Sequence, residues 1–195
     1  MAATPATLFT VQNVAVVFGV ASVYLSTREN IWSWPTAIVN VALYGLVFFR
    51  EKLYADMGLQ GVFLLLSIYG WYEWLHGGEH RTRLRVSRAS PRLWVLLAVL
   101  NITAWLLLAT ILHRFTDASL PYLDSLLTTT SLVAQWMMTR KILENWALWI
   151  AVDIVYVPMF ISRGLHPTAL LYAIFLGLAV MGYRDWRRSL ASGVP

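Results

Sequence analysis

The sequence predicts an all-α integral membrane protein with seven transmembrane helices, and three observations support this fold class. First, 58% of the residues are hydrophobic and only 13% are charged, with a mean hydropathy of +0.61. Such a chain has too little polar surface to cover a soluble globule. Second, it contains seven long apolar runs, and third, two of its regions repeat each other. We therefore expect a single membrane domain, residues 1–195.

The apolar runs define the predicted spans. Each has about the length, 18 to 23 residues, that crosses roughly 30 Å of hydrocarbon as a helix. The predicted spans are 8–26, 31–49, 53–75, 92–112, 121–139, 145–162 and 166–184. Short charged turns, Arg50-Glu51-Lys52 and Arg163-Gly164, separate the second span from the third and the sixth from the seventh.

The basic residues predict the orientation of these spans. With the N-terminus outside, eleven of the 15 lysines and arginines fall in inner segments and four in outer ones. An excess of positive charge in cytoplasmic loops is the rule for membrane proteins. We therefore expect the N-terminus outside and the C-terminus in the cytoplasm, and the net charge of +5 requires no nucleic acid. Because the start, MAATPATLFTVQ, has no cationic leader, we expect no removable signal peptide.

The repeat predicts how the spans are arranged. Aligned without gaps, 10–74 and 122–186 share more identities than this composition gives by chance, and we call this pairing the repeat alignment. The matched pairs include Trp34 with Trp146 and Gly70 with Gly182. We expect a first three-helix repeat at 8–75, a linker helix at 92–112 and a second repeat at 121–186. The single linker helix gives both repeats the same orientation, so 3+1+3 parallel repeats would enclose a substrate between them, as in some small transporters.

An acidic residue in the sixth span is the first candidate for function. In the stretch NWALWIAVDIVYVP, Asn145, Trp149, Asp153 and Tyr156 are spaced to share one face of a helix. An ionised carboxylate that faces lipid would cost at least a few kcal/mol. This face is therefore predicted to point into a polar cavity.

Other spans carry similar polar or aromatic faces. Amide and hydroxyl groups can both donate and accept hydrogen bonds to a polyol such as ribose, and tryptophan faces suit a flat, cationic ring. The further candidate substrate-binding residues are Trp34, Asn40, Tyr44, Gln60, Trp71, Trp74 and Gln135.

Each candidate has a structural alternative. Tryptophans near span ends often form a belt at the membrane interface, and this interpretation is favoured for Trp32, Trp34, Trp94, Trp136 and Trp186. Buried amides, and Asp153 itself, are also explained as hydrogen-bonding groups between helices. Asp124 and the four histidines, His76, His80, His113 and His166, are expected to be solvated near span ends. The chain has no cysteine and no span with a histidine pair, so we expect no catalytic residue, metal site or cofactor.

Several stretches resemble the PnuC-type vitamin transporters, especially the members that carry nicotinamide riboside. They are WPTAIVN, YGLVFF, GLQGVFLLLSIYGWYEW and DSLLTTTSLVAQWMMTRKILENWALWIAVDIVYVP. The resemblance covers about residues 30–186 and is most specific at Trp71 with Trp74, at Gln135 to Lys141, and at Asn145, Trp149 and Asp153.

The resemblance implies a SWEET-like fold in the bacterial inner membrane and a function in vitamin uptake for NAD biosynthesis. It implies facilitated diffusion of nicotinamide riboside, which a cytoplasmic kinase then phosphorylates and so traps. Thiamine or riboflavin as the vitamin, and proton-coupled uptake through Asp153, remain alternatives. An intramembrane enzyme is disfavoured because the spans lack a nucleophile with its base. The sequence leaves open whether copies associate into a homo-oligomer.

Overall fold

The computed structural model describes residues 5–116 and 120–192, and these residues form seven α-helices and one short 3₁₀ helix. The elements are α1 (Pro5–Thr27), α2 (Ser33–Arg50), α3 (Tyr54–His76), η1 (Glu79–Arg81), α4 (Pro91–Phe115), α5 (Pro121–Thr139), α6 (Asn145–Ser162) and α7 (His166–Ser192). Each predicted span coincides with one α-helix, which confirms the all-helical fold and both short charged turns. The last helix continues past the predicted end of its span, to Ser192.

The helix boundaries follow local sequence signals. Proline occupies the first position of α4 and of α5, where its missing N–H removes no helical hydrogen bond. The Ser90 hydroxyl accepts a hydrogen bond from the backbone N–H of Leu93 and so caps α4. At the other end of several helices the chain turns through left-handed backbone, at Glu29, Lys52 and Gly164 among others.

Four of the helices are long and apolar enough to cross a membrane by length and composition alone. They are α1 (from Thr10), α4, α6 and α7. The helix α5 is less apolar because its buried face carries hydroxyl groups, those of Ser125, Thr129 and Ser131. Such a helix suits the interior of a bundle, where protein rather than lipid surrounds its polar side chains.

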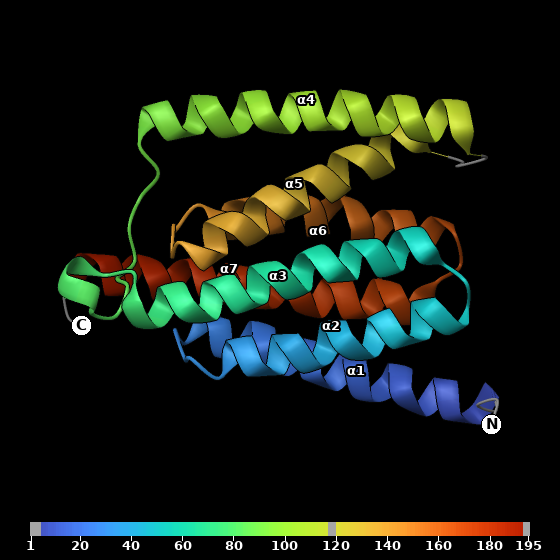
Figure 1. Ribbon diagram of the computed structural model, residues 1–195, viewed down its shortest axis with the longest axis horizontal. Helices are drawn as coiled ribbons and strands as arrows, with labels where there is room; N and C mark the ends of the chain where they lie inside the picture. The colour runs from blue at the N-terminus through green and yellow to red at the C-terminus, as the bar shows by residue number, and fades with distance from the viewer. Residues whose placement is uncertain (1–4, 117–119, 193–195) are drawn as a thin grey trace.

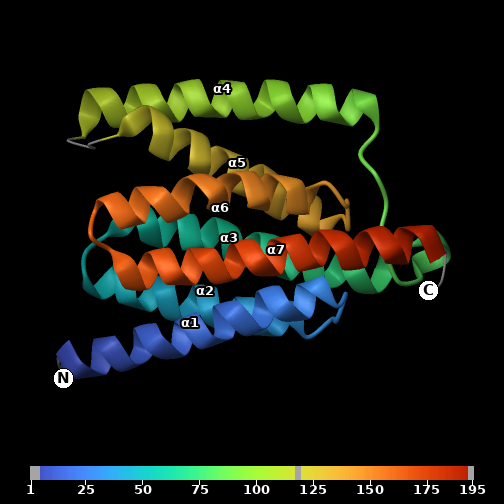
Figure 2. The same cartoon turned by 180° about the vertical axis from the view of Figure 1, so that it is seen from behind.

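The helices other than α4 form a closed ring. Going round it, α1 packs on α2, α2 on α3, α3 on α5, α5 on α6, α6 on α7, and α7 again on α1. Helix α4 lies outside the ring and packs against α5 (Figures 1 and 2). Its outward surface is apolar and exposed, which suits contact with lipid.

Many contacts in the ring occur twice, at positions paired by the repeat alignment. The alignment matches the end of α1 with that of α5, the start of α2 with that of α6, and the start of α3 with that of α7. The φ angles of Glu29 and Lys141, which follow α1 and α5, are 52° and 49°. The aromatic stack of Tyr44 on Phe48 has its counterpart in that of Tyr156 on Phe160. The sequence similarity between the two regions is therefore accompanied by similar local geometry.

Four tryptophans pack together at the end of the ring where α2 and α6 begin. The rings of Trp34 and Trp74 meet edge to face at 5.2 Å, those of Trp146 and Trp186 at 5.5 Å, and Trp74 lies 5.9 Å from Trp186. Because Trp34 is only 2% exposed and Trp186 is fully buried, their predicted place in an interfacial belt is wrong. Trp32, at 65% exposure, does lie at the surface. Whether a tryptophan lies in the cluster or at the surface depends on its burial against other rings, which sequence position alone does not reveal.

Two glycines make this packing possible. A Cβ atom on Gly70 would overlap the indole ring of Trp34, and one on Gly182 would lie 2.5 Å from the ring of Trp146. The absence of a side chain at each position lets the tryptophan of one helix lie against the backbone of another.

The connection between α3 and α4 also lies on this end of the ring. Its backbone at Leu84 donates to the carbonyl of Trp74, and Ser87 exchanges hydrogen bonds with Lys141 and Leu143. The side chain of Val86 is 8% exposed and packs on the tryptophan cluster. We call residues 83–89 the strap, because they connect α3 to the turn between α5 and α6.

The glycine contacts give a stability prediction. Replacing Gly70 or Gly182 by alanine is expected to lower the free energy of unfolding by roughly 1–3 kcal/mol, the usual cost of overpacking. Thermal unfolding of the purified protein in detergent measures the change. Gly177→Ala in α7 is the matched control, since a Cβ there meets nothing within 4 Å. Equal loss of stability in all three variants would contradict this account of the cluster.

Candidate functional site

Asp153 is the most unusual side chain inside the ring. It lies near the middle of α6 and is 3% exposed, so it does not face lipid. Within residues 5–116 and 120–192 its carboxylate has no hydrogen-bond or ion-pair partner. A buried carboxylate with no partner is costly, and such groups inside membrane proteins usually serve function.

Aromatic side chains lie along the C-terminal half of this face of α6. The ring of Tyr156 stacks on Phe160 at 5.5 Å and lies 4.7 Å from the ring of Tyr172 on α7. Tyr156 lies three residues after Asp153 and therefore shares its face of α6. The site therefore combines an acid with ring faces, a combination suited to a flat cation.

Tyr172 was not among the predicted site residues, although the sequence contained a signal for it. The repeat alignment places Tyr172 on Gln60, which was predicted to bind substrate. Extending that assignment to the second repeat would have identified Tyr172.

The N-terminal part of the same face begins with Asn145. Its side chain is fully buried, and its Nδ2 donates to the carbonyl oxygen of Ile142 at 2.6 Å. Eight residues along the helix, or about 12 Å, separate it from Asp153. Trp149 lies between them, half-buried and packed against the tryptophan cluster. The predicted face of α6 is thus continuous from the cluster to Asp153.

The amide and tyrosine candidates on the other helices are half-buried. Asn40 donates its amide to the carbonyl of Ala15 on α1 at 2.6 Å, a contact between helices of the kind considered above as an alternative to substrate binding. Tyr44 stacks on Phe48. Gln60 of α3 and Gln135 of α5 are also half-buried.

The tryptophan candidates of the first half differ in their surroundings. Trp34 and Trp74 lie in the packed cluster, and the indole N–H of Trp74 donates to the carbonyl of Met138 at 3.0 Å. Trp71 is 39% exposed and contacts no other aromatic ring among the described residues. Trp71 and Trp149 are therefore the two tryptophan candidates with free ring surface.

Buried polar atoms without a partner occur at equivalent places in the two halves. In the described part of the chain these atoms include the Ser33 hydroxyl, the Trp34 indole nitrogen, the Asn145 Oδ1 and the Trp146 indole nitrogen. Ser33 and Trp34 match Asn145 and Trp146 in the repeat. Because buried polar groups are normally satisfied, internal water or a polar ligand is expected near the starts of α2 and α6.

Ion pairs join the two halves at the same end. Lys141 Nζ is 2.8 Å from Glu29 Oε2 and lies over the ring of Trp74 at 4.6 Å. Arg140 pairs with Glu73 at 2.7 Å, and Arg28 with Asp185 at 3.7 Å. Each pair links a residue before residue 77 to one after residue 139, so these contacts connect the two triplets of helices.

The described residues show no cluster of three histidine, aspartate or glutamate side chains that would hold a metal ion. All four histidines are exposed, and so is Asp124.

Comparison with known proteins identifies the family. A family model described as nicotinamide mononucleotide transporter matches residues 10–188. The chain belongs to this family. It is a membrane transporter and not an enzyme, and the predicted resemblance to PnuC-type transporters is confirmed.

Individual relatives in the family cover most of the chain. The nicotinamide riboside transporter PnuC of Escherichia coli (strain K12) is 28% identical over 204 aligned residues, covering 92% of this chain and 85% of that protein. The riboflavin/roseoflavin transporter RibM of Streptomyces davaonensis is 27% identical, covering 87% and 81%. A crystal structure of the vitamin B3 transporter PnuC superposes with a TM-score of 0.74 at 26% identity, covering 93% and 82%.

The ion pair between Glu29 and Lys141 gives a prediction for the stability of the ring. Glu29→Gln leaves the ammonium of Lys141, which is 6% exposed, without its partner and is expected to cost roughly 1–3 kcal/mol. The charge-swapped double variant, Glu29→Lys with Lys141→Glu, should recover most of this loss. Thermal unfolding in detergent measures both effects. Asp185→Asn, which removes the more exposed ion pair with Arg28, is the control and should lower stability less. A charge-swapped variant that is no more stable than Glu29→Gln would contradict the proposed pairing.

Proposed function

We propose that this protein carries nicotinamide riboside across the bacterial inner membrane by facilitated diffusion. The observation that carries the proposal is Asp153, a buried acid on the same face of α6 as Tyr156, whose ring contacts that of Tyr172. Nicotinamide riboside has a pyridinium cation, a carboxamide and ribose hydroxyls. A carboxylate offsets the cation, aromatic faces stack on the ring, and amides bond the carboxamide or the ribose.

The roles of the other candidates follow from their chemistry and placement. Trp149 and Trp71 would flank the pyridinium ring, because both retain free ring surface. Asn145, whose Oδ1 has no partner among the described residues, would accept a hydrogen bond from the carboxamide or ribose. Gln60 and Gln135 would supply further amides.

The arrangement we propose is two parallel three-helix repeats, α1 to α3 and α5 to α7, joined by α4 in a SWEET-like 3+1+3 fold. Recurrence of helix boundaries and ring contacts at positions paired by the repeat alignment supports it. The charge distribution supports seven spans with the N-terminus outside and the C-terminus in the cytoplasm. Transport would be a rocking of one repeat against the other around the site.

Trapping in the cytoplasm would be the work of a kinase that phosphorylates the vitamin after entry. Nicotinamide mononucleotide, the phosphorylated form of the riboside, should not be carried, although the family model is named for it. A phosphate needs free cations, and the buried Lys141 is already paired with Glu29. Arg140 is likewise paired with Glu73.

Riboflavin is the second candidate substrate, because RibM, a relative of nearly the same identity, is named for riboflavin and roseoflavin. The free flavin ring is neutral, so it would make no use of the Asp153 charge. Thiamine, which carries a cationic ring, is a third. The charge of the bound ring therefore separates riboflavin from the other two candidates, which only direct binding measurements separate from each other.

Calorimetric titration of the purified protein with nicotinamide riboside, thiamine, riboflavin and nicotinamide mononucleotide tests the proposal. We expect nicotinamide riboside to bind most tightly. Asp153→Asn and Trp149→Ala should each weaken it by about tenfold or more, the effect of losing about 1.4 kcal/mol. Asp124→Asn, which changes an exposed acid, and Trp94→Ala on α4 are the matched controls and should leave the affinity unchanged. Tightest binding of riboflavin, unaffected by Asp153→Asn, would refute the choice of vitamin.

Uptake into proteoliposomes tests the mode of transport. Facilitated diffusion predicts that internal nicotinamide riboside reaches the external concentration and no more, with or without a pH gradient. Asp153→Asn is expected to slow this equilibration without changing its end point. Accumulation above the external concentration that needs both the gradient and Asp153 would instead establish proton coupling.

A further inference from the structure

The triplets α1–α3 and α5–α7 meet along two seams, one between α1 and α7 and one between α3 and α5. The repeat alignment pairs the helices of one seam with those of the other. Each has the same tryptophan bond near its end, from Trp186 to the Ser26 carbonyl at 2.9 Å and from Trp74 to the Met138 carbonyl at 3.0 Å. Differences between the seams therefore show where the two halves are not equivalent.

The α3–α5 seam is closed by close contacts. The Arg140 guanidinium is 2.7 Å from the Glu73 carboxylate and donates to the Tyr69 hydroxyl at 3.1 Å. The strap crosses the same seam, since its backbone bonds both Trp74 at the end of α3 and Lys141 after α5. Val86 of the strap is buried on the tryptophan cluster. Opening this seam would break charged, backbone and apolar contacts together.

The α1–α7 seam has a longer ion pair at the positions that the repeat alignment matches with Glu73 and Arg140. Arg28 lies 3.7 Å from one carboxylate oxygen of Asp185, and Arg188, also on α7, lies 3.8 Å from the other. Both distances exceed that of a hydrogen bond, and the two arginine side chains are 57% and 82% exposed. Ion pairs so exposed to water contribute little to stability.

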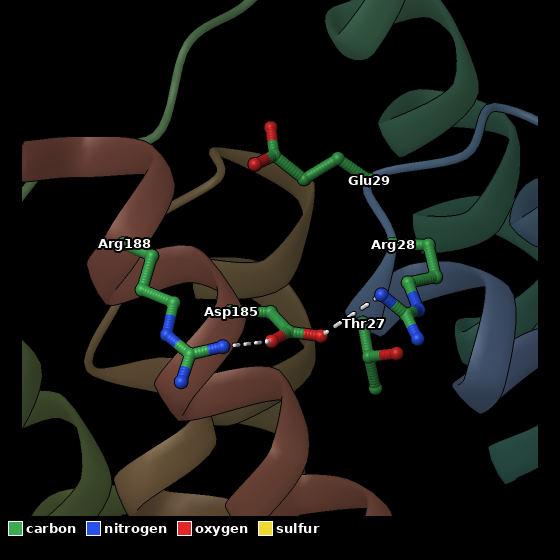
Figure 3. Close-up of a pocket in the computed structure, with 5 residues that line it drawn as sticks. All are labelled: Thr27, Arg28, Glu29, Asp185 and Arg188. Carbon is green, nitrogen blue, oxygen red and sulfur yellow. Dashed lines mark ion pairs between the residues drawn. The ribbon is translucent and has the colours of Figure 1, made fainter. Parts of the chain in front are cut away.

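A cavity open to solvent occupies this seam. It has a volume of about 290 Å³ and is lined by Thr27, Arg28, Glu29, Asp185 and Arg188. Figure 3 shows Asp185 between the two arginines, with Thr27 beside Arg28 and Glu29 turned away from them. The backbone hydrogen bonds of the strap join the end of α3 to the turn after α5. They therefore lie at the other seam and do not cover this cavity.

We propose that the α1–α7 seam is the gate that opens on the inner side, while the α3–α5 seam stays closed and acts as the hinge. The proposal rests on the proposed transport function, because a gate implies a substrate path between the halves. The asymmetry supplies its physical reason: the seam whose ion pair is longer and more exposed to water separates first. Substrate would then leave past the polar walls of the cavity at Thr27 and Asp185.

Thiol labelling tests the gate, and the absence of cysteine from the chain supplies a clean background. Thr27 and Thr139 are equivalent in the repeat, at 1% and 0% exposure, and each hydroxyl bonds the carbonyl three residues earlier. Thr27→Cys should react with a membrane-impermeant maleimide in inside-out vesicles about tenfold or more faster than Thr139→Cys, because transient opening exposes only the first. Total thiol is counted after denaturation, and only variants that elute as a single folded species are compared.

The labelling result needs no vitamin, so it separates the gate from the proposed function. Equal rates at the two sites, or faster reaction of Thr139→Cys, would overturn the gate. A faster rate at Thr27→Cys in a protein that takes up none of the tested vitamins would overturn the proposed substrate and leave the gate supported.

Cross-linking then connects the gate to transport. The double variants Arg28→Cys with Asp185→Cys, and Glu73→Cys with Arg140→Cys, place equivalent cysteine pairs across the two seams. Treatment with a short, rigid bis-maleimide should reduce uptake by about tenfold or more for the first pair and by less than about twofold for the second. Each is compared with the same variant treated with a mono-maleimide. Block of uptake by the second pair, with the first pair unaffected, would reverse the assignment of gate and hinge.

Discussion

A polar group in hydrocarbon must find its partner within the protein, and this constraint determines the rest of the structure. Helices satisfy their own backbone, so the described fold is entirely helical apart from its connections. Polar side chains then have to turn away from lipid. The hydroxyls of Ser125, Thr129 and Ser131 and the carboxylate of Asp153 are accordingly buried in a ring of six helices, while the outer helix α4 shows an apolar surface.

The repeat explains how the ring closes and why its halves differ in sequence. In the proposed arrangement of two similar halves, equivalent residues near the axis between them would face each other, so identical charges there would repel. Glu29 and Lys141 are such equivalents, and their opposite charges turn repulsion into a 2.8 Å ion pair. Away from this contact the halves also diverge: Val41 corresponds to Asp153 and Gln60 to Tyr172. The second half thus carries the acid and the extra ring that the proposed site requires.

Sequence reasoning predicted the helices well because their lengths and turns depend on local composition, as the charged turns after Arg50 and before Leu165 illustrate. It also found the face of α6 that includes Asp153, since helical spacing fixes which residues share a face. It failed where contact between distant segments decides. Trp34 and Trp186 were assigned to the membrane interface because they lie near span ends, but Gly70 and the neighbouring rings bury them. The packing of Trp186 depends on residues from both halves of the chain, which no local pattern reports.

The proposed gate and the proposed substrate site fit together energetically. A ligand shifts a conformational equilibrium only by the difference between its affinities for the two states. A cation that neutralises Asp153 offers such a difference, because burying that carboxylate alone is costly and burying it with a counter-ion is less so. The seam that must then separate, between α1 and α7, is crossed by the solvated ion pair of Arg28 with Asp185 and by the hydrogen bond from Trp186 to the Ser26 carbonyl. In the proposed mechanism, a weak seam opposing a strong local interaction would let the binding of one small cation shift the ring between its two states.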